Sequence, residues 1–358
     1  MAIPSSNNCK KTLTLSVSLP KLEFGCYQYW IDNIVIYIDI MLFLGGEKMQ
    51  TETKTSYNPV TPNKGWKVWW KLTRPHTLTA AFVPVLLGTA LAIHETKINL
   101  GLFFAMLVAS LLIQAATNMF NEYYDYKRGL DNEESVGIGG TIVRDGVKPK
   151  TIMQIALGLY GVSILIGVYI CMNTSWWLAA IGLFCMIIGY LYTGGPLPIA
   201  YTPFGEIFAG FFMGMGIILI SFYIQAGTIT VTSILVSVPI FILVGAILLS
   251  NNIRDLDGDK EFGRKTLAIL LGRKKAIYLL ASMFTVSYIW VFVLMMMSYS
   301  SAWMAIVVLS APKAIQATKG FIGKTIPIQM MPAMKATAQT NTIFGFLLSI
   351  GLFLDYFI

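Results

Sequence analysis

Long apolar runs without charged side chains recur along the chain after residue 75. A helix needs about 20 apolar residues to cross a bilayer core about 30 Å thick, and nine runs meet or approach that length. They are His76 to Ile93, Ile98 to Phe120, Ile152 to Met172, Trp176 to Tyr192, Ile207 to Gln225, Ile229 to Ser250, Ala276 to Ser298, Ser301 to Ser310 and Thr340 to Leu354. The pattern predicts an all-α polytopic membrane protein with about nine transmembrane helices.

The loops between these runs alternate in charge. On one side they are short and almost uncharged, whereas those on the other side carry every Lys and Arg after Met49 except Lys97. Cytoplasmic loops of membrane proteins carry an excess of Lys and Arg. We therefore expect a plasma-membrane protein whose amino terminus and basic loops are cytoplasmic and whose carboxyl terminus is outside.

The composition agrees with this class and excludes several others. Of 358 residues, 56% are hydrophobic and only 12% are charged, against about 25% charged in soluble domains. The net charge of +8 is explained by the basic loops, so we expect no nucleic-acid partner. The four cysteines have no CxxC spacing and the two histidines stand far apart, which favours neither a disulfide framework nor a histidine metal site.

The first 48 residues differ from the rest. They mix Ser, Asn and Lys with a short apolar run that contains Asp32 and Asp39 and is too short and charged to span comfortably. The stretch Gly45-Gly-Glu-Lys-Met49 is what a purine-rich ribosome-binding site and start codon would give when read in frame. We predict a non-native or disordered extension over 1–48 with Met49 as the true start, an amphipathic cytoplasmic lead-in over 49–75 and a transmembrane domain over 76–358. A signal peptide is the less favoured alternative, because no Ala-x-Ala cleavage pattern follows.

Two acidic clusters follow predicted spans and would face the cytoplasm. In the first, Asn121 and Asp125 are four residues apart, and in the second Asp255 and Asp259 repeat that spacing, which places each pair on one face of a helix. Such carboxylates repel one another unless a cation lies between them, and Mg²⁺ prefers a few carboxylates together with phosphate oxygens. The clusters predict a site for Mg²⁺ and a diphosphate; ordinary solvated loop residues are the alternative.

Other polar residues near these clusters are candidate substrate ligands. Arg74, beside a proline at the start of the first span, is a candidate for a substrate carboxylate or a simple membrane anchor. Tyr192 belongs to a group of tyrosines that would shelter a developing cation or anchor the interface. The remaining candidate substrate ligands are Asn118, Lys127, Arg128, Arg144, Arg254 and Lys265. The basic residues in the same loops as the acidic clusters, Arg264 among them, would take the remaining diphosphate charge.

These motifs resemble the UbiA prenyltransferase superfamily. The resemblance begins at about Trp66, and it includes Asn121-Glu-Tyr-Tyr-Asp125 with Asp131, and Asn252-Ile-Arg-Asp255 with Asp259. The runs Thr73 to Thr77, Ser135 to Pro149 and Tyr192 to Glu206 resemble the branch that prenylates 1,4-dihydroxy-2-naphthoate for menaquinone. Two departures stand out: Glu122 stands where the family commonly has Asp, and Asp131 is displaced from the usual third acid.

The resemblance implies a fold, a cofactor and a reaction. A UbiA-like bundle would bind Mg²⁺ through Asp125, Asp255 and Asp259, helped by Asn121 and, as further ligands, Glu122 and Asp131. Polyprenyl diphosphate would then prenylate 1,4-dihydroxy-2-naphthoate with loss of carbon dioxide to give demethylmenaquinone, with the lipid bilayer around the isoprenoid. A UbiA-type enzyme with another acceptor, such as 4-hydroxybenzoate, is the nearest alternative. An ion-coupled transporter is disfavoured, because it needs ionisable residues at the bilayer midplane.

Overall fold

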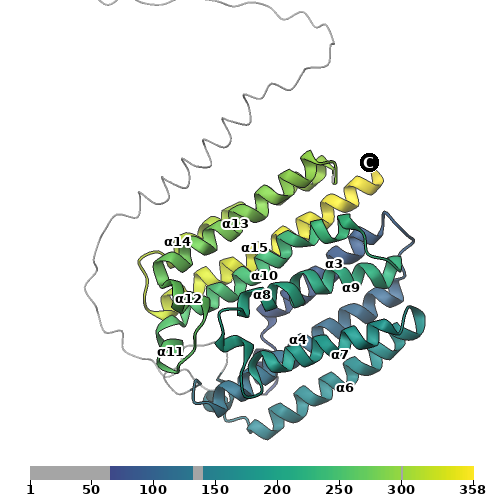
Figure 1. Cartoon of the computed structure of the whole chain (residues 1–358). Helices are drawn as coiled ribbons and strands as arrows, with labels where there is room; N and C mark the ends of the chain where they lie inside the picture. Colours follow the sequence, from purple (N-terminus) through teal and green to yellow (C-terminus); the bar gives the residue numbers. More distant parts are fainter. Residues whose placement is uncertain (1–64, 132–139, 300) are drawn as a thin grey trace, which may run out of the picture. The chain divides into compact units, whose positions relative to one another are not determined.

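The chain is described from a computed structural model over residues 65–131, 140–299 and 301–358 (Figure 1). The predicted extension over 1–48 and the lead-in up to residue 64 lie outside the described residues. Every regular element in the described part is helical, so the predicted all-α class is confirmed.

The helices follow one another with short connections. In chain order they are α2 (Trp66–Leu72), α3 (Pro75–Ala92), α4 (Leu100–Lys127), α5 (Thr141–Asp145), α6 (Pro149–Asn173), α7 (Trp177–Thr193), η1 (Ile199–Tyr201), α8 (Gly205–Ala209), η2 (Gly210–Gly216), α9 (Ile217–Ala226), α10 (Val231–Arg254), α11 (Leu256–Glu261), α12 (Leu267–Leu271), α13 (Arg273–Met296), η3 (Ala302–Ser310), α14 (Ala311–Phe321) and α15 (Pro327–Phe357).

The long helices begin and end where the local sequence favours it. Asn99 accepts a hydrogen bond from the Leu102 backbone N–H at the start of α4, and Thr230 and Ser233 form a capping box at the start of α10; both satisfy orphan donors. The wide π-helical turn η2 joins α8 to α9, so that Gly205–Ala226 forms one apolar span. Gly210 and Gly214 allow this turn to approach the backbone at Phe241 of α10, where no Cβ would fit.

The helices run side by side as a bundle (Figure 1). α4 packs on α6, α10 on α13, and α3 on both α9 and α15. The short helices α11 and α12 lie at one end of this bundle and the carboxyl terminus at the other (Figure 1). The ends of α4 and α10, where the sequence carries its acidic clusters, are therefore close to the short helices.

The predicted number of nine spans is not confirmed. Among the described residues, six helices are long and apolar enough to cross a bilayer: α4, α6, α8 to α9, α10, α13 and α15. A seventh is the bent pair of α2 with α3, and α7 is apolar but shorter. These helices establish a membrane protein.

The carboxyl-terminal region differs most from the prediction. The expected span Ser301–Ser310 is a 3₁₀ helix that continues into α14, and the last helix begins at Pro327 instead of Thr340. The sequence pattern placed a long loop over 311–339 because of Lys313, Lys319 and Lys335. These lysines are instead spaced along helices whose other faces bury Ala314, Ala317 and Ala333, which is the amphipathic pattern of a helix that ends in polar surroundings.

Candidate active site

One arginine connects the two acidic clusters. Arg264, in the turn after α11, donates to Asp125 Oδ1 over 2.8 Å and to Asp259 Oδ1 over 3.0 Å. All three side chains are largely buried, and the two carboxylates raise the pKa of the guanidinium above its ordinary value. The structure thus brings the predicted residues Asp125 and Asp259 together, although they are far apart in the sequence.

Asn121 extends this group towards Arg74. With the Asn121 amide oriented to satisfy both neighbours, its nitrogen donates to Asp125 Oδ2 over 2.5 Å and its oxygen accepts from Arg74 Nη1 over 3.1 Å. Arg74 has a positive φ of 51°, a left-handed conformation rare for a side chain other than glycine, and it directly precedes Pro75, which disfavours the right-handed helical region. Strained residues of this kind cluster at functional sites.

The buried carboxyl groups of Asp259 and Asp131 have too little positive charge near them to offset their burial. Burial raises the pKa of Asp259 to about 7, and the Asp255 and Asp125 carboxylates raise it further while Arg264 opposes them. Burial also raises the pKa of Asp131 to about 7, with Asp125 and Glu122 adding to the shift. Asp259 Oδ2 is buried and has no hydrogen-bond partner among the described residues. A buried, unpartnered carboxylate oxygen beside further carboxylates fits a divalent cation.

Among the described residues, no group of three or more Asp, Glu, Cys or His side chains lies close enough together to hold a metal ion. The reason lies in the pairing partners. Arg264 lies between Asp125 and Asp259, and Asp255 is paired with Arg254 through Nε over 2.6 Å. Asp255 is also about a third exposed, because it lies between the helices, after the end of α10 at Arg254 and before the start of α11 at Leu256. Asp255 and Asp259 therefore only partly share the helix face that their four-residue spacing predicts.

Glu122 and Asn118 hold the local fold. The Glu122 carboxylate is 1% exposed, accepts the backbone N–H groups of Gly140 and Ile142 over 3.0 and 3.2 Å, and lies 3.6 Å from Arg74. Asn118 donates to the Thr73 carbonyl and the Thr77 hydroxyl over 2.8 and 2.9 Å. The two residues fasten the start of α3 and the start of α5 to α4, so the structure places Glu122 in a supporting position.

The predicted basic ligands divide into three groups. Arg128 donates to the Thr193 and Gly195 carbonyls and lies over the Tyr124 and Tyr201 rings, so it fastens the turn after α7. Lys127 and Lys265 are exposed beside the site. Arg144 is close enough to lower the pKa of Asp131, whereas Arg254 is buried against Asp255 and Met331.

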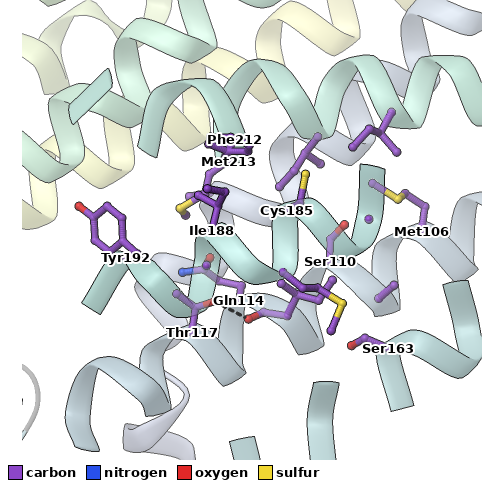
Figure 2. Close-up of a pocket in the computed structure, with 18 of the residues that line it drawn as sticks. Met106, Ser110, Gln114, Thr117, Ser163, Cys185, Ile188, Tyr192, Phe212 and Met213 are labelled. Atoms are coloured by element: carbon purple, nitrogen blue, oxygen red, sulfur yellow. Dashed lines mark hydrogen bonds between the residues drawn. The ribbon is translucent and has the colours of Figure 1, made fainter. Parts of the chain in front are cut away.

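An apolar cavity of about 420 Å³ lies directly behind this polar group. Arg74, Asn121 and Asn251 line one end, and α4, α6, α7, η2 and α9 supply its apolar walls. Tyr192 and Met106 lie at opposite ends of it (Figure 2). The Tyr192 hydroxyl is buried with no partner among the described residues. The site therefore combines a buried acidic and basic group with a long hydrophobic chamber, which suits a ligand with an anionic head and an apolar tail.

Sequence reasoning missed part of this site. The sequence presents Arg264 only as one of several loop cations, and no local signal distinguishes it from Lys265, because only the fold places it between the two acidic clusters. Glu206 is buried at 5% exposure and accepts from Asn252 over 2.9 Å. It is the only acidic residue between Asp145 and Asp255, a signal that could have found it. Tyr201 stacks on both Arg128 and Arg264.

Comparisons with known proteins agree with this geometry. The profile of the UbiA prenyltransferase family matches residues 81–323. The chain is 64% identical over 81% of its length to 1,4-dihydroxy-2-naphthoate octaprenyltransferase of Bacillus subtilis, covering 94% of that protein, and 26% identical to the Escherichia coli enzyme of the same name, over 81% and 96% of the two chains.

Solved structures show the same fold. A UbiA homologue of Aeropyrum pernix aligns with a TM-score of 0.58 at 16% identity, over 78% of this chain and 98% of that one. A homologue of Archaeoglobus fulgidus bound to DMAPP and Mg²⁺ aligns with a TM-score of 0.51 at 15% identity, over 79% and 99%. Since the family profile covers most of the chain and a close relative matches nearly end to end, the chain belongs to the UbiA prenyltransferase family.

Proposed function

We propose that this membrane prenyltransferase transfers a polyprenyl group from polyprenyl diphosphate to 1,4-dihydroxy-2-naphthoate, with loss of carbon dioxide and diphosphate, to give demethylmenaquinol, the reduced form of demethylmenaquinone. The observation that carries the proposal is the apolar cavity that adjoins the Asp125, Arg264 and Asp259 group. The Bacillus subtilis relative, at 64% identity, supports the acceptor and the prenyl donor.

Asp125, Asp259 and Asp255 would hold Mg²⁺, which when bound neutralises the leaving diphosphate. The Archaeoglobus fulgidus homologue bound to DMAPP and Mg²⁺ supports a divalent cation as a ligand of this fold. Asn121 orients Asp125 through its amide, and Asp131 adds negative charge beside it. Arg264 is held beside the same carboxylates and is placed to donate to phosphate oxygens as well.

The reaction breaks the allylic carbon–oxygen bond, and its electron pair leaves with the diphosphate. The ring carbon that bears the acceptor's carboxylate then forms the new carbon–carbon bond, and loss of carbon dioxide restores the aromatic ring. Arg74 lines the cavity beside Asn121, where its guanidinium suits that carboxylate. The apolar walls exclude water, which protects the cationic isoprenoid end from hydrolysis and strengthens each polar contact.

The position of the site at one end of the bundle fits a cytoplasmic active site in the plasma membrane. The ends of α4 and α10 carry the site together with Lys127, Arg128 and Arg254. Basic residues favour the cytoplasmic side, and on this proposal the amino terminus would lie inside and the carboxyl terminus outside.

A membrane assay tests the function. Membranes containing the protein are supplied with radiolabelled octaprenyl diphosphate and either 1,4-dihydroxy-2-naphthoate or 4-hydroxybenzoate, with Mg²⁺ or EDTA. We expect product only with the naphthoate, loss of product in EDTA and recovery with Mg²⁺. Product only with 4-hydroxybenzoate would establish the alternative acceptor, and the absence of any prenylation would refute the proposal.

A matched pair of variants tests the site. Asp259→Asn should lower kcat/KM by about 100-fold or more, because it removes charge stabilisation at the reacting group. Asp257→Asn is the control: its carboxylate is 69% exposed and pairs with Arg273, so its loss should change kcat/KM by less than about fivefold. Equal effects of the two substitutions would contradict the site assignment.

A further inference from the structure

Glu206 is a buried acid to which the reaction described above gives no role. It lies in the first turn of α8 and is 5% exposed. Asn252 on α10 donates to its Oε1 over 2.9 Å, whereas its Oε2 is buried and has no hydrogen-bond partner among the described residues. An ionisable side chain inside a membrane protein is costly and is by default a candidate for function. The bond to Asn252 accounts for only one of the two carboxyl oxygens.

The Tyr192 hydroxyl is a second unpartnered polar group in the same place. Tyr192 lies near the end of α7 and lines one end of the cavity (Figure 2), and its hydroxyl is buried without a partner among the described residues. A Cβ added to Gly205 would lie 3.4 Å from this hydroxyl and 3.3 Å from Leu248, which also lines the cavity. Glu206, the next residue after Gly205, therefore begins directly behind the cavity wall that Tyr192 and Leu248 form.

The electrostatic surroundings of Tyr192 lead to the same placement. Among the charged groups that act on its hydroxyl, Glu206 has the largest effect, followed by Arg264 and Asp125. Tyr192 is thus at the polar end of the cavity, where Arg74 also lines the wall. The Tyr192 hydroxyl lies between the cavity on one side and the Glu206 carboxyl group on the other.

The two unpartnered groups are chemically complementary. A phenol hydroxyl both donates and accepts a hydrogen bond, whereas an ionised carboxylate only accepts. Because neither the Tyr192 hydroxyl nor Glu206 Oε2 has a hydrogen bond to give up, the first can donate to the second without breaking another contact. The lone pairs of the same hydroxyl then remain free to accept a hydrogen bond from a ligand in the cavity.

The proposed reaction needs a group that accepts a proton and later returns it. The acceptor carbon that forms the new bond neighbours a ring carbon with a hydroxyl. Bond formation turns this hydroxyl into a carbonyl, so its proton must leave. The resulting β-keto carboxylate loses carbon dioxide, the electron pair of the broken carbon–carbon bond forms an enolate, and the enolate oxygen takes the proton back. The proton thus leaves and returns at the same oxygen.

We propose that Tyr192 and Glu206 form the proton relay for this hydroxyl. The acceptor hydroxyl gives its proton to Tyr192 Oη while Tyr192 passes its own proton to Glu206 Oε2, and both transfers reverse after carbon dioxide has left. Tyr192 contacts the acceptor and Glu206 acts through Tyr192. The inference rests on the proposed function, since it takes a dihydroxynaphthoate as the acceptor. With the acceptor's carboxylate at Arg74, Tyr192 supplies the polar wall for the neighbouring hydroxyl.

Isosteric variants separate proton transfer from structural support. Glu206→Gln keeps an oxygen that can accept from Asn252 but is no longer a base, and Tyr192→Phe removes only the hydroxyl. Each should lower kcat for prenylation of the naphthoate by about 100-fold or more, because proton transfer by a positioned group contributes about that much. KM for octaprenyl diphosphate should change by less than about threefold, because neither group binds the donor. The double variant should be no slower than the slower single variant, because the two residues act as one unit.

A thermal measurement and a distant acid provide the controls. Tm in detergent should stay at or above that of the unaltered protein in Tyr192→Phe, because the variant removes a buried hydroxyl that has no partner. Glu95→Gln makes the same chemical change at an exposed residue after the end of α3 opposite to Arg74, and should change kcat by less than about twofold. Should Glu206→Gln fail to reach the membrane, Tyr192→Phe carries the kinetic test by itself.

The outcomes distinguish the relay from the proposed function. Full activity in Glu206→Gln or in Tyr192→Phe, with the unaltered protein active on the naphthoate, would overturn the relay and leave the proposed function standing. A double variant whose loss is the product of the two single losses would also overturn it, because the residues would then act independently. If the unaltered protein prenylates no naphthoate, the proposed function fails and the relay fails with it.

Discussion

Asp259 carries its charge at an energetic cost in the folded chain. It is 5% exposed, one of its oxygens has no partner among the described residues, and Asp125 and Asp255 repel it. Arg264 compensates for part of this repulsion by contacting both Asp125 and Asp259. The arginine thus keeps two acidic residues together, and a divalent cation bound with a diphosphate would relieve the remaining repulsion.

The pKa of Asp259 predicts how stability depends on pH. Its ordinary value is 3.8 and its value in the fold is about 7, so the native state binds more protons than the unfolded state between these values. Stability of the EDTA-treated protein should therefore fall as pH rises through this window. In detergent, we expect Tm to drop between about pH 5 and pH 8, and to drop less in Asp259→Asn.

The same Tm measurement is repeated with added Mg²⁺. At pH 8, Mg²⁺ should raise Tm in the unaltered protein, because a ligand that binds the native state stabilises it, and should do so less in Asp259→Asn. Identical pH profiles in the two proteins would show that Asp259 stays ionised across the range and would remove this explanation.

At the scale of elements, the site depends on how the loops around α4 are fastened. Glu122 fixes the start of α5, Asn118 fixes the turn before α3, and Arg128 fixes the turn after α7. α7 ends at Thr193, before the run Gly194, Gly195 and Pro196, since glycine and proline cannot continue it favourably. The acidic groups are therefore positioned by three neighbouring turns as well as by their own helices.

Substitutions at Glu122 test whether this residue supports the local fold or binds a metal ion. Glu122→Ala leaves two buried backbone N–H groups unpaired and should destabilise the protein by about 2 kcal/mol or more, measured as a lower Tm. Glu122→Gln keeps an acceptor oxygen and should cost less. The rise in Tm on adding Mg²⁺ should be the same in both variants as in the unaltered protein. If both variants keep the stability of the unaltered protein but lose the rise in Tm on adding Mg²⁺, Glu122 is instead a metal ligand.

At the scale of the whole molecule, both acidic clusters must face one compartment to bind one diphosphate. Single cysteines at Lys127 and Lys260 should be protected from a membrane-impermeant maleimide in intact cells, while those at Asn173 and Thr228 should be labelled, all in a background without the four native cysteines. All four positions are exposed, so protection reports the side of the membrane. Inverted vesicles should reverse the pattern; labelling of Lys127→Cys and Lys260→Cys from opposite faces would exclude a shared site.

The sequence by itself determined the all-helical class, the membrane location and the acidic clusters. Apolar runs near the length of a bilayer crossing allow only helices there, because every backbone polar group must be satisfied within the segment. Asp125 and Asp259 stood out because charge is rare in such a chain, and Asn121 stood out because it lies four residues before Asp125. These are local properties, and hydropathy and spacing record them directly.

The tertiary structure decided the pairings. Arg264 lies between Asp125 and Asp259, Asp255 pairs with Arg254, and Glu122 accepts a hydrogen bond from the backbone at the start of α5. Each pairing depends on how α4, α10 and the turns after them are placed relative to one another. The spacing of residues along a single helix does not contain this information. The same is true of the apolar cavity, because it is the space left by side chains from several helices once they pack.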